Sequence, residues 1–242
     1  MTTHLSDVQA EKSADAHLSP RTDVPGVTQS GTLLAPPADS RAEEVHAVSR
    51  HLVIEHLRAV TPAVESLVRN ADTLAGWGVE MADRLLAGHR LLAAGNGGSA
   101  AEAQHLTAEL VGRFDGEREP FSAISLHAES SAVTAIANDY GFEQMYARQV
   151  RAHGRQGDLL VLLSTSGRSA NLLHAAAAAR AAGVTTWALT GVGPNPLTEC
   201  VDEYVAIDAA SANAQEGHLI ALHAICRAFD AEVSRRRQAE RR

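Results

Sequence analysis

The sequence predicts a doubly wound α/β fold, in which helices cover both faces of a five-stranded parallel sheet. Short apolar runs alternate with longer segments of helical periodicity, the pattern of repeated strand–helix units. The run at 159–163 is apolar at every position, as in a strand buried on both sides. With 242 residues, of which 45% are hydrophobic and 21% charged, the chain is expected to form one globular domain.

The predicted elements follow in chain order. Residues 1–42 are rich in Ser, Thr, Asp, Pro and Ala without a sustained apolar period, so we expect a disordered tail before a single domain at 43–242. Apolar residues then recur at helical spacing through 45–64 and 67–85, which predicts two leading helices. Strands are expected at 91–94, 123–126, 159–163 and 185–189, with a shorter one at 204–207. A final helix over 214–235 completes the domain.

Bulk composition restricts the kind of partner. The formal net charge of −8 argues against electrostatic attraction to nucleic acid or anionic lipid. No apolar run approaches the ~18 residues of a membrane-spanning helix. Cys200 and Cys226 are the only cysteines, and their spacing fits neither a disulfide framework nor a zinc knuckle. We therefore expect a cytoplasmic protein that acts on a small molecule and binds neither nucleic acid nor membranes.

A glycine-rich loop follows the first predicted strand. Its sequence, GNGGS at 95–99, leads directly into a helix. Glycines let the backbone approach a ligand, and free amides at a helix start favour an anion such as a phosphate. The alternatives are a turn that merely joins strand to helix, and a loose dinucleotide fingerprint that lacks an acidic residue closing the next strand.

A second polar loop ends the third predicted strand. It reads STSGRS at 164–169 and again precedes a helix. Four hydroxyl groups beside the free amides of a helix start form a donor-rich site that matches phosphate oxygens. Helix capping requires only one such hydroxyl.

Two predicted helices carry possible metal ligands. His105 and Glu109 are four residues apart and share one helix face, as do Gln215 and His223, which are eight apart. If the helices meet, imidazole and carboxylate groups converge in a set that suits zinc or another first-row divalent ion. A solvated His–Glu pair is the alternative from spacing alone.

These motifs together resemble one known family. Their order is GNGGS, His105 with Glu109, NDYGF at 138–142, STSGRS, and Gln215 with His223. In this combination the chain resembles the sedoheptulose-7-phosphate (phosphoheptose) isomerases of the SIS group, over roughly residues 45–235. The resemblance implies a SIS-type, flavodoxin-like sheet and a homotetramer with active sites between subunits.

The resemblance also implies residue roles. The sugar phosphate would be held by Asn96, Gly97, Gly98, Ser99, Glu109, Arg113, Asn138, Asp139, Ser164, Thr165, Ser166, Ser169 and Gln215. Zinc, or another divalent first-row metal, would be held by His105, Glu109, Gln215 and His223. Glu109 would act as base and His223 as acid in a proton shuttle between C1 and C2 through an enediol. From the residues alone, a structural turn explains Asn138 and Asp139 equally well.

The sequence departs from the family at Ala212, three residues before Gln215, where an aspartate is expected. The accessory proton-transfer or substrate-contact role of that aspartate is then vacant, unless Asn213 or Asp208 replaces it.

Two non-enzymatic alternatives share the fold. The DnaA initiator-associating protein is a relative that need not keep the catalytic residues, whereas Glu109 and His223 are both present here. A sugar-phosphate-sensing regulator would carry a DNA-binding module, and the N-terminal segment offers none. The enzyme is therefore the favoured interpretation.

Overall fold

The computed structural model describes residues 40–242, with side chains from residue 42 onward. Apart from its last residues, the tail predicted at 1–42 lies outside the described part of the chain. One compact unit spans Val45–Arg242, and it contains the whole sheet.

A five-stranded, all-parallel sheet forms the centre of this unit. Its strands are β1 (Leu91–Gly95), β2 (Ala123–Ser125), β3 (Leu159–Ser164), β4 (Thr185–Thr190) and β5 (Glu203–Ala206). They are arranged in the order β2-β1-β3-β4-β5. All five predicted strands are confirmed, and the order is the flavodoxin-like one. The sequence of strands reverses between β1 and β3, so this is where ligands bind in such sheets.

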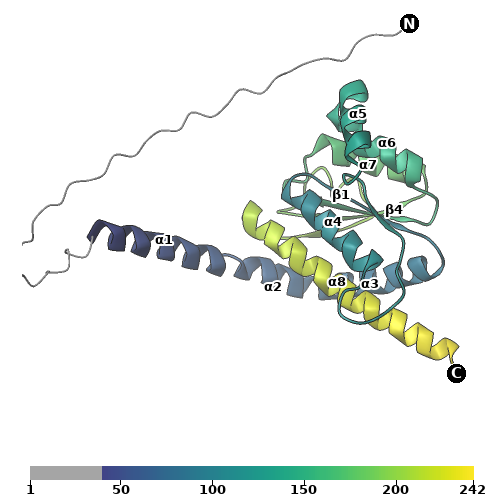
Figure 1. The fold of residues 1–242 in the computed structure, drawn as a ribbon, viewed down its shortest axis with the longest axis horizontal. Helices are drawn as coiled ribbons and strands as arrows, with labels where there is room; N and C mark the ends of the chain where they lie inside the picture. The colour runs from purple at the N-terminus through teal and green to yellow at the C-terminus, as the bar shows by residue number, and fades with distance from the viewer. Residues whose placement is uncertain (1–39) are drawn as a thin grey trace, which may run out of the picture. The chain divides into compact units, whose positions relative to one another are not determined.

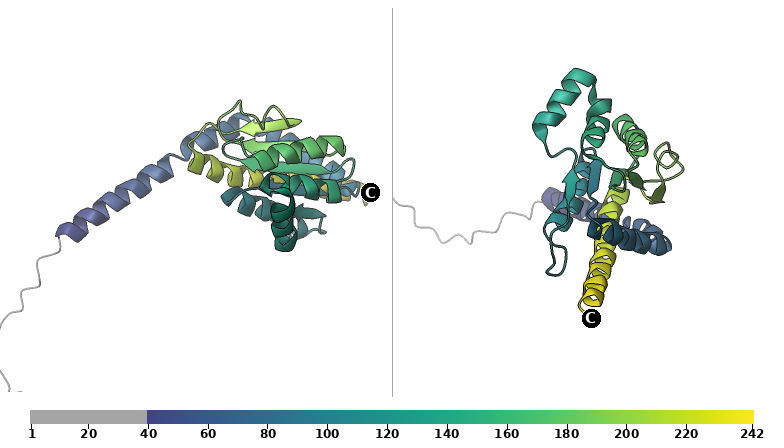
Figure 2. Two further views of the ribbon diagram at one scale, coloured as in Figure 1. Left: turned by 90° about the horizontal axis from the view of Figure 1, so that it is seen from above. Right: turned by 90° about the vertical axis from the view of Figure 1, so that its right-hand side faces the viewer.

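Helices cover both faces of the sheet (Figures 1 and 2). They are α1 (Ser40–Arg58), α2 (Thr61–Arg69), α3 (Ala71–Leu86), α4 (Gly98–Val111), α5 (Ser130–Tyr140), α6 (Met145–His153), α7 (Ala170–Ala181) and α8 (Ser211–Glu240). Residues of α3, α4 and α8 bury one face, and residues of α6 and α7 bury the other. None of the helices in the described range is long and apolar enough to cross a membrane.

The prediction of two leading helices is wrong, because the structure has three before β1. The first break falls at residues 59–60, where Pro62 stands at the start of α2. Proline lacks an amide donor, so it is accepted in the first turn of a helix but not in the middle of one. The second break falls at Asn70, whose side chain donates to the Ser66 carbonyl and so ends α2.

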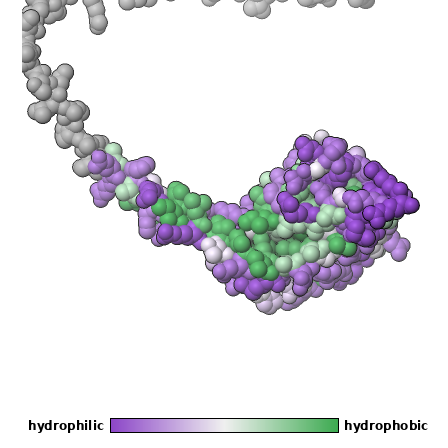
Figure 3. Space-filling model, turned by 90° about the horizontal axis from the view of Figure 1, so that it is seen from below, coloured by the Kyte–Doolittle hydropathy of each residue, from purple (hydrophilic) through white to green (hydrophobic). Residues whose placement is uncertain are grey.

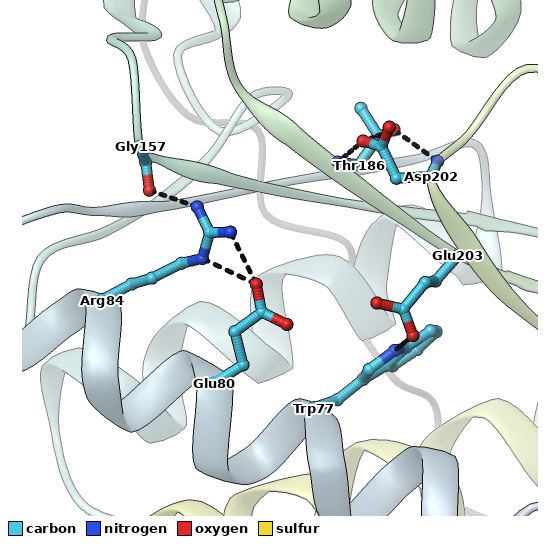
Figure 4. A network of polar contacts seen from close by, with 7 residues as sticks. All are labelled: Trp77, Glu80, Arg84, Gly157, Thr186, Asp202 and Glu203. Carbon is cyan, nitrogen blue, oxygen red and sulfur yellow. Dashed lines mark hydrogen bonds and ion pairs between the residues drawn. The ribbon is translucent and has the colours of Figure 1, made fainter.

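Helix α3 is tied to the sheet by aromatic and polar contacts. Trp77 stacks on Trp187 of β4 with ring centroids 4.9 Å apart, and its indole N–H donates to Glu203 of β5. About two turns further along α3, Arg84 pairs with Glu80 and donates to the Gly157 carbonyl ahead of β3 (Figure 4). These contacts fix α3 beneath the sheet, and α8 packs against α3 in turn.

Among residues 42–242, an apolar surface is exposed along α1, α2 and α8 (Figure 3). Its exposed members include Val45, Val48, Leu52, Val53, Leu57, Val64, Val68 and Ile220. Val68 is 69% exposed and Leu57 is 65% exposed, although both are large aliphatic side chains. Between α2, α3 and α8 the same surface forms a groove lined by aliphatic residues. Contiguous apolar surface of this kind marks an interaction site.

Gly78 permits the close approach of α3 to α8, and this generates a stability prediction. A Cβ at Gly78 would lie 2.5 Å from the Ala228 Cβ and 2.9 Å from the Ile225 carbonyl oxygen. We expect Gly78→Ala to lower the free energy of unfolding by about 1–3 kcal/mol in urea denaturation, because the helices must separate. Gly76→Ala on the same helix is the control; it meets no atom within 4 Å and should be neutral or stabilising. Equal stability of the two variants would contradict the prediction.

Candidate functional site

The two predicted loops lie side by side at the carboxyl edge of the sheet. The first follows β1 and the second follows β3, on either side of the point where the strand order reverses. The amides of Asn96 and Asn171 join them through two reciprocal hydrogen bonds of 3.0 and 2.8 Å. The structure therefore brings both polar loops to one ligand-binding edge.

The first loop presents main-chain donors. Gly97 has φ = 55°, a conformation that favours glycine, and its carbonyl accepts the amides of Ala100 and Ala101. The amides of Gly98 and Ser99 precede these and have no acceptor within α4, so they are available to an anion. The Ser99 side chain itself is buried, so its contribution to the loop is its main-chain amide.

The second loop is shaped by its own hydroxyl groups. Ser164 is buried, and its Oγ accepts the amide of Gly167, which has φ = 59°. Ser166 is exposed and its Oγ accepts the amide of Arg168. Thr165 and Ser169 are half-buried at the rim. Two of the four predicted hydroxyls thus hold the loop in its conformation.

Three of the four predicted metal ligands converge between α4 and α8. The Nε2 atoms of His105 and His223 are 2.9 Å apart, and His105 Nε2 is 3.0 Å from Glu109 Oε1. The donor atoms of all three residues lie within 4.8 Å of one another. Phe114 packs against the His223 ring at a centroid distance of 5.2 Å, so one side of the cluster is apolar.

Gln215 lies beside this cluster. Its amide sits against Gly98, where a Cβ would be 2.1 Å from Gln215 Nε2. Gln215 and His105 line the same open hollow, together with Glu102 and Leu219. The fourth predicted ligand therefore connects the cluster to the first loop.

The sequence reasoning missed a buried pair next to the cluster. Glu102 on α4 and His218 on α8 are 8% and 0% exposed, and their Oε2 and Nδ1 atoms are 3.8 Å apart. Burial raises the pKa of Glu102 to about 7. Burial also lowers the pKa of His218 to about 4, and the Thr190 carbonyl, which faces the ring without meeting hydrogen-bond geometry, opposes this only in part. The signal in the sequence was the spacing of Glu102 and His105, which places both on one face of α4.

Other predicted residues stay apart from the cluster. Asn138 and Asp139 are exposed and bonded to each other, and within residues 42–242 neither side chain is hydrogen-bonded to the two loops. They lie in the last turn of α5, so the interpretation as a turn is wrong; the turn comes at Gly141, with φ = 87°. Arg113 is exposed just after α4.

The region around Ala212 offers no clear replacement for the missing aspartate. Ala212 is exposed in the first turn of α8. Asn213 is buried and donates to Glu216, so its amide is already engaged. Asp208 is exposed before the helix, and its amide donates to Ser66.

Comparison with known proteins agrees with this geometry. A model of the SIS domain matches residues 55–191. The phosphoheptose isomerase of Streptomyces coelicolor is 59% identical over 184 residues, covering 76% of this chain and 80% of that protein. The chain belongs to the phosphoheptose isomerase branch of the SIS domain family. Phosphoheptose isomerase GmhA from Neisseria gonorrhoeae superposes with a TM-score of 0.67 at 37% identity, covering 77% of this chain and 98% of that one. A relative from Nitratidesulfovibrio vulgaris, also named phosphoheptose isomerase, is 45% identical over 180 residues, which cover 74% of this chain and 86% of that protein.

The donor set of this SIS-domain protein fits a divalent cation. His105 and His223 supply imidazole nitrogens and Glu109 supplies carboxylate oxygens, a combination that suits zinc and other first-row ions. Glu109 is only 19% exposed, so its carboxylate is partly withdrawn from water while facing an imidazole. A partly buried cluster of this composition is compatible with a metal centre.

Tyr146 supports the first loop, and its hydroxyl can be tested. The buried Tyr146 donates to the Gly95 carbonyl at the end of β1. We expect Tyr146→Phe to lower the free energy of unfolding by about 1–3 kcal/mol, because this carbonyl loses a donor in a dry environment. The control is Tyr140→Phe, since Tyr140 is 51% exposed and its ring carries the Arg148 guanidinium. Denaturant titrations in which both variants match wild type would contradict the prediction.

Proposed function

We propose that the protein is an isomerase that converts sedoheptulose 7-phosphate to D-glycero-D-manno-heptose 7-phosphate. Relatives that carry the name phosphoheptose isomerase are 59% and 45% identical to it. The observation that carries the proposal is that His105 and Glu109, on a helix that begins at the glycine-rich loop, meet His223 of α8. A non-enzymatic initiator-associating protein would have no need of this convergence.

The phosphate is assigned to the second loop. Hydroxyls of Thr165, Ser166 and Ser169 and the free amides at the start of α7 supply donors for a dianion. Ser211 Oγ donates to Thr165 Oγ1, so the start of α8 braces the loop from one side. The sugar chain then runs toward the first loop and Glu109.

Proton transfer is assigned to two residues of the cluster. The Glu109 carboxylate removes the proton from C1 of the open-chain ketose and returns it to C2, while His223 moves a proton between the two oxygens. Glu109 has two carboxylate oxygens, so it can face His105 with one and the substrate with the other. A divalent ion held by His105, Glu109, Gln215 and His223 supplies charge stabilisation for the enediolate when it is bound.

The assembly is proposed to be a homotetramer with sites completed between subunits. The apolar surface of α1, α2 and α8 supports this, because the described residues of one chain leave side chains such as Leu57 and Val68 exposed. Neighbouring copies would also bring groups to Arg113, Asn138 and Asp139, which stand apart from the cluster here. A cytoplasmic location is proposed as well, since Cys200 and Cys226 are both free thiols.

The activity is tested directly by incubating purified protein with sedoheptulose 7-phosphate and following the aldose product. We expect wild type to turn over and Glu109→Gln to lose about 10²–10⁴-fold in kcat while still binding the sugar phosphate, because the base is gone. Glu117→Gln, which removes an exposed carboxylate on the following loop, is the control and should keep full activity. An active Glu109→Gln variant would remove Glu109 from the role of base, and an inactive, zinc-loaded wild type would overturn the function.

The metal site is tested by thermal denaturation of chelator-treated protein. Added zinc at 100 times its Kd should stabilise wild type by about 2.7 kcal/mol, because the ion binds only the folded chain. His105→Ala and His223→Ala should abolish most of the shift. His174→Ala is the control, since His174 is exposed on α7 and bonded to Gln144. A wild-type midpoint that does not move with zinc, cobalt or manganese would contradict the metal site.

A further inference from the structure

Helices α4 and α8 meet along a seam of paired residues. On α4 the facing positions are Gly98, Glu102, His105 and Glu109, which recur at intervals of four, three and four residues and so share one face. On α8 they are Gln215, His218 and His223. The pairs Gly98–Gln215, Glu102–His218 and His105–His223 ascend together in both helices, so the helices run parallel.

The middle pair of this seam is buried and polar. Glu102 Oε2 and both ring nitrogens of His218 have no hydrogen-bond partner within the described residues. A buried polar group without a partner is destabilising, and a matched apolar pair in such a place is often more stable. Fold stability alone therefore gives no reason for this pair.

We propose that Glu102 and His218 are positioning residues. They approach each other to form a direct hydrogen bond between α4 and α8, and this bond places His105 and Glu109 opposite His223 for cation binding. This inference rests on the proposed metal site. Glu102 Oε2 and His218 Nδ1 are 3.8 Å apart, and no other side chain in the described part of the chain is bonded to either atom, so an approach of about 1 Å completes the bond.

The rigidity of the helices carries this effect to the ligands. Glu102 lies one turn before His105 on α4, and His218 lies five residues before His223 on α8. An α-helix transmits a displacement of one turn to the next, so the distance across the middle pair constrains the distance across the ligand pair. Metal–ligand bonds tolerate deviations of only ~0.2 Å, which makes the cluster sensitive to this spacing.

The protonation states suit such a bond. With the pKa of Glu102 near 7 and that of His218 near 4, the imidazole is neutral at pH 7 and the carboxyl group is partly protonated. A neutral carboxyl can donate to a neutral imidazole without burying a net charge, which avoids the desolvation cost of an ion pair.

The experiment separates positioning from plain structural support by measuring two quantities on full-length, chelator-treated protein. Zinc affinity is measured by competition with a chromophoric chelator, and stability by the thermal midpoint of the metal-free chain. We expect the double variant Glu102→Leu, His218→Leu to keep or raise the midpoint while weakening zinc binding by about 10- to 100-fold.

Asp158→Asn is the matched control for a buried carboxylate. Asp158 is 2% exposed at the opposite edge of the sheet, where it accepts the amides of Arg90 and Arg155. We expect this variant to lower the midpoint and leave zinc affinity unchanged. Zinc affinity of the double variant within about twofold of wild type, a difference of only ~0.4 kcal/mol, would overturn the inference.

If the double variant fails to fold, two single variants at Glu102 test the positioning role instead. Glu102→Gln keeps a group that bonds to His218 and should retain most of the zinc affinity, whereas Glu102→Ala should lose it. Equal zinc affinity of these two variants would overturn this inference but leave the metal site standing. A wild-type protein that binds no zinc would overturn the metal site and the inference with it, while measured turnover would still report separately on the isomerase.

Discussion

The packing of α4 against α8 is the contact on which the candidate site depends. Both helices start at the carboxyl edge of the sheet, α4 after β1 and α8 after β5, so they lie parallel on one face. This arrangement brings His105 and His223 together across 118 residues of chain. The seam is polar at Glu102 and His218, where apolar residues are often at least as stable, and local rules are broken in this way mainly at functional sites.

Apolar packing on either side compensates for this polar seam. Leu106 and Leu110 of α4 and Leu222 of α8 are fully buried in the same core, and each such side chain contributes about 1.5–3 kcal/mol. The stacked pair of Trp77 and Trp187 holds α3 to the sheet, and α8 packs against α3. The ligand-bearing helices are therefore held by contacts that do not involve the ligands.

The two loops contribute hydrogen-bond donors that are held in fixed positions. Their donors are main-chain amides and short hydroxyl side chains, whose positions are set by the helix starts and by hydrogen bonds such as Asn96–Asn171. Donors fixed in this way need little reorganisation when a charged group arrives. The loops, which bind an anion, and the helix seam, which carries the acid and base groups, meet at Gly98, where Gln215 touches the first loop.

The sequence by itself determined the strands, the two loops and the helices that carry His105 and His223, because continuous apolar runs and glycine or hydroxyl motifs are local signals. It did not reveal the helix breaks at residues 59–60 and Asn70, since the predicted boundary at 65–66 falls inside α2, nor the helical state of Asn138. Only the tertiary structure decided that α4 faces α8 and that Glu102 and His218 are buried between them. Periodicity shows which face of a helix is apolar, but a polar residue at the margin of that face is predicted to be solvent-exposed until the helix that covers it is known.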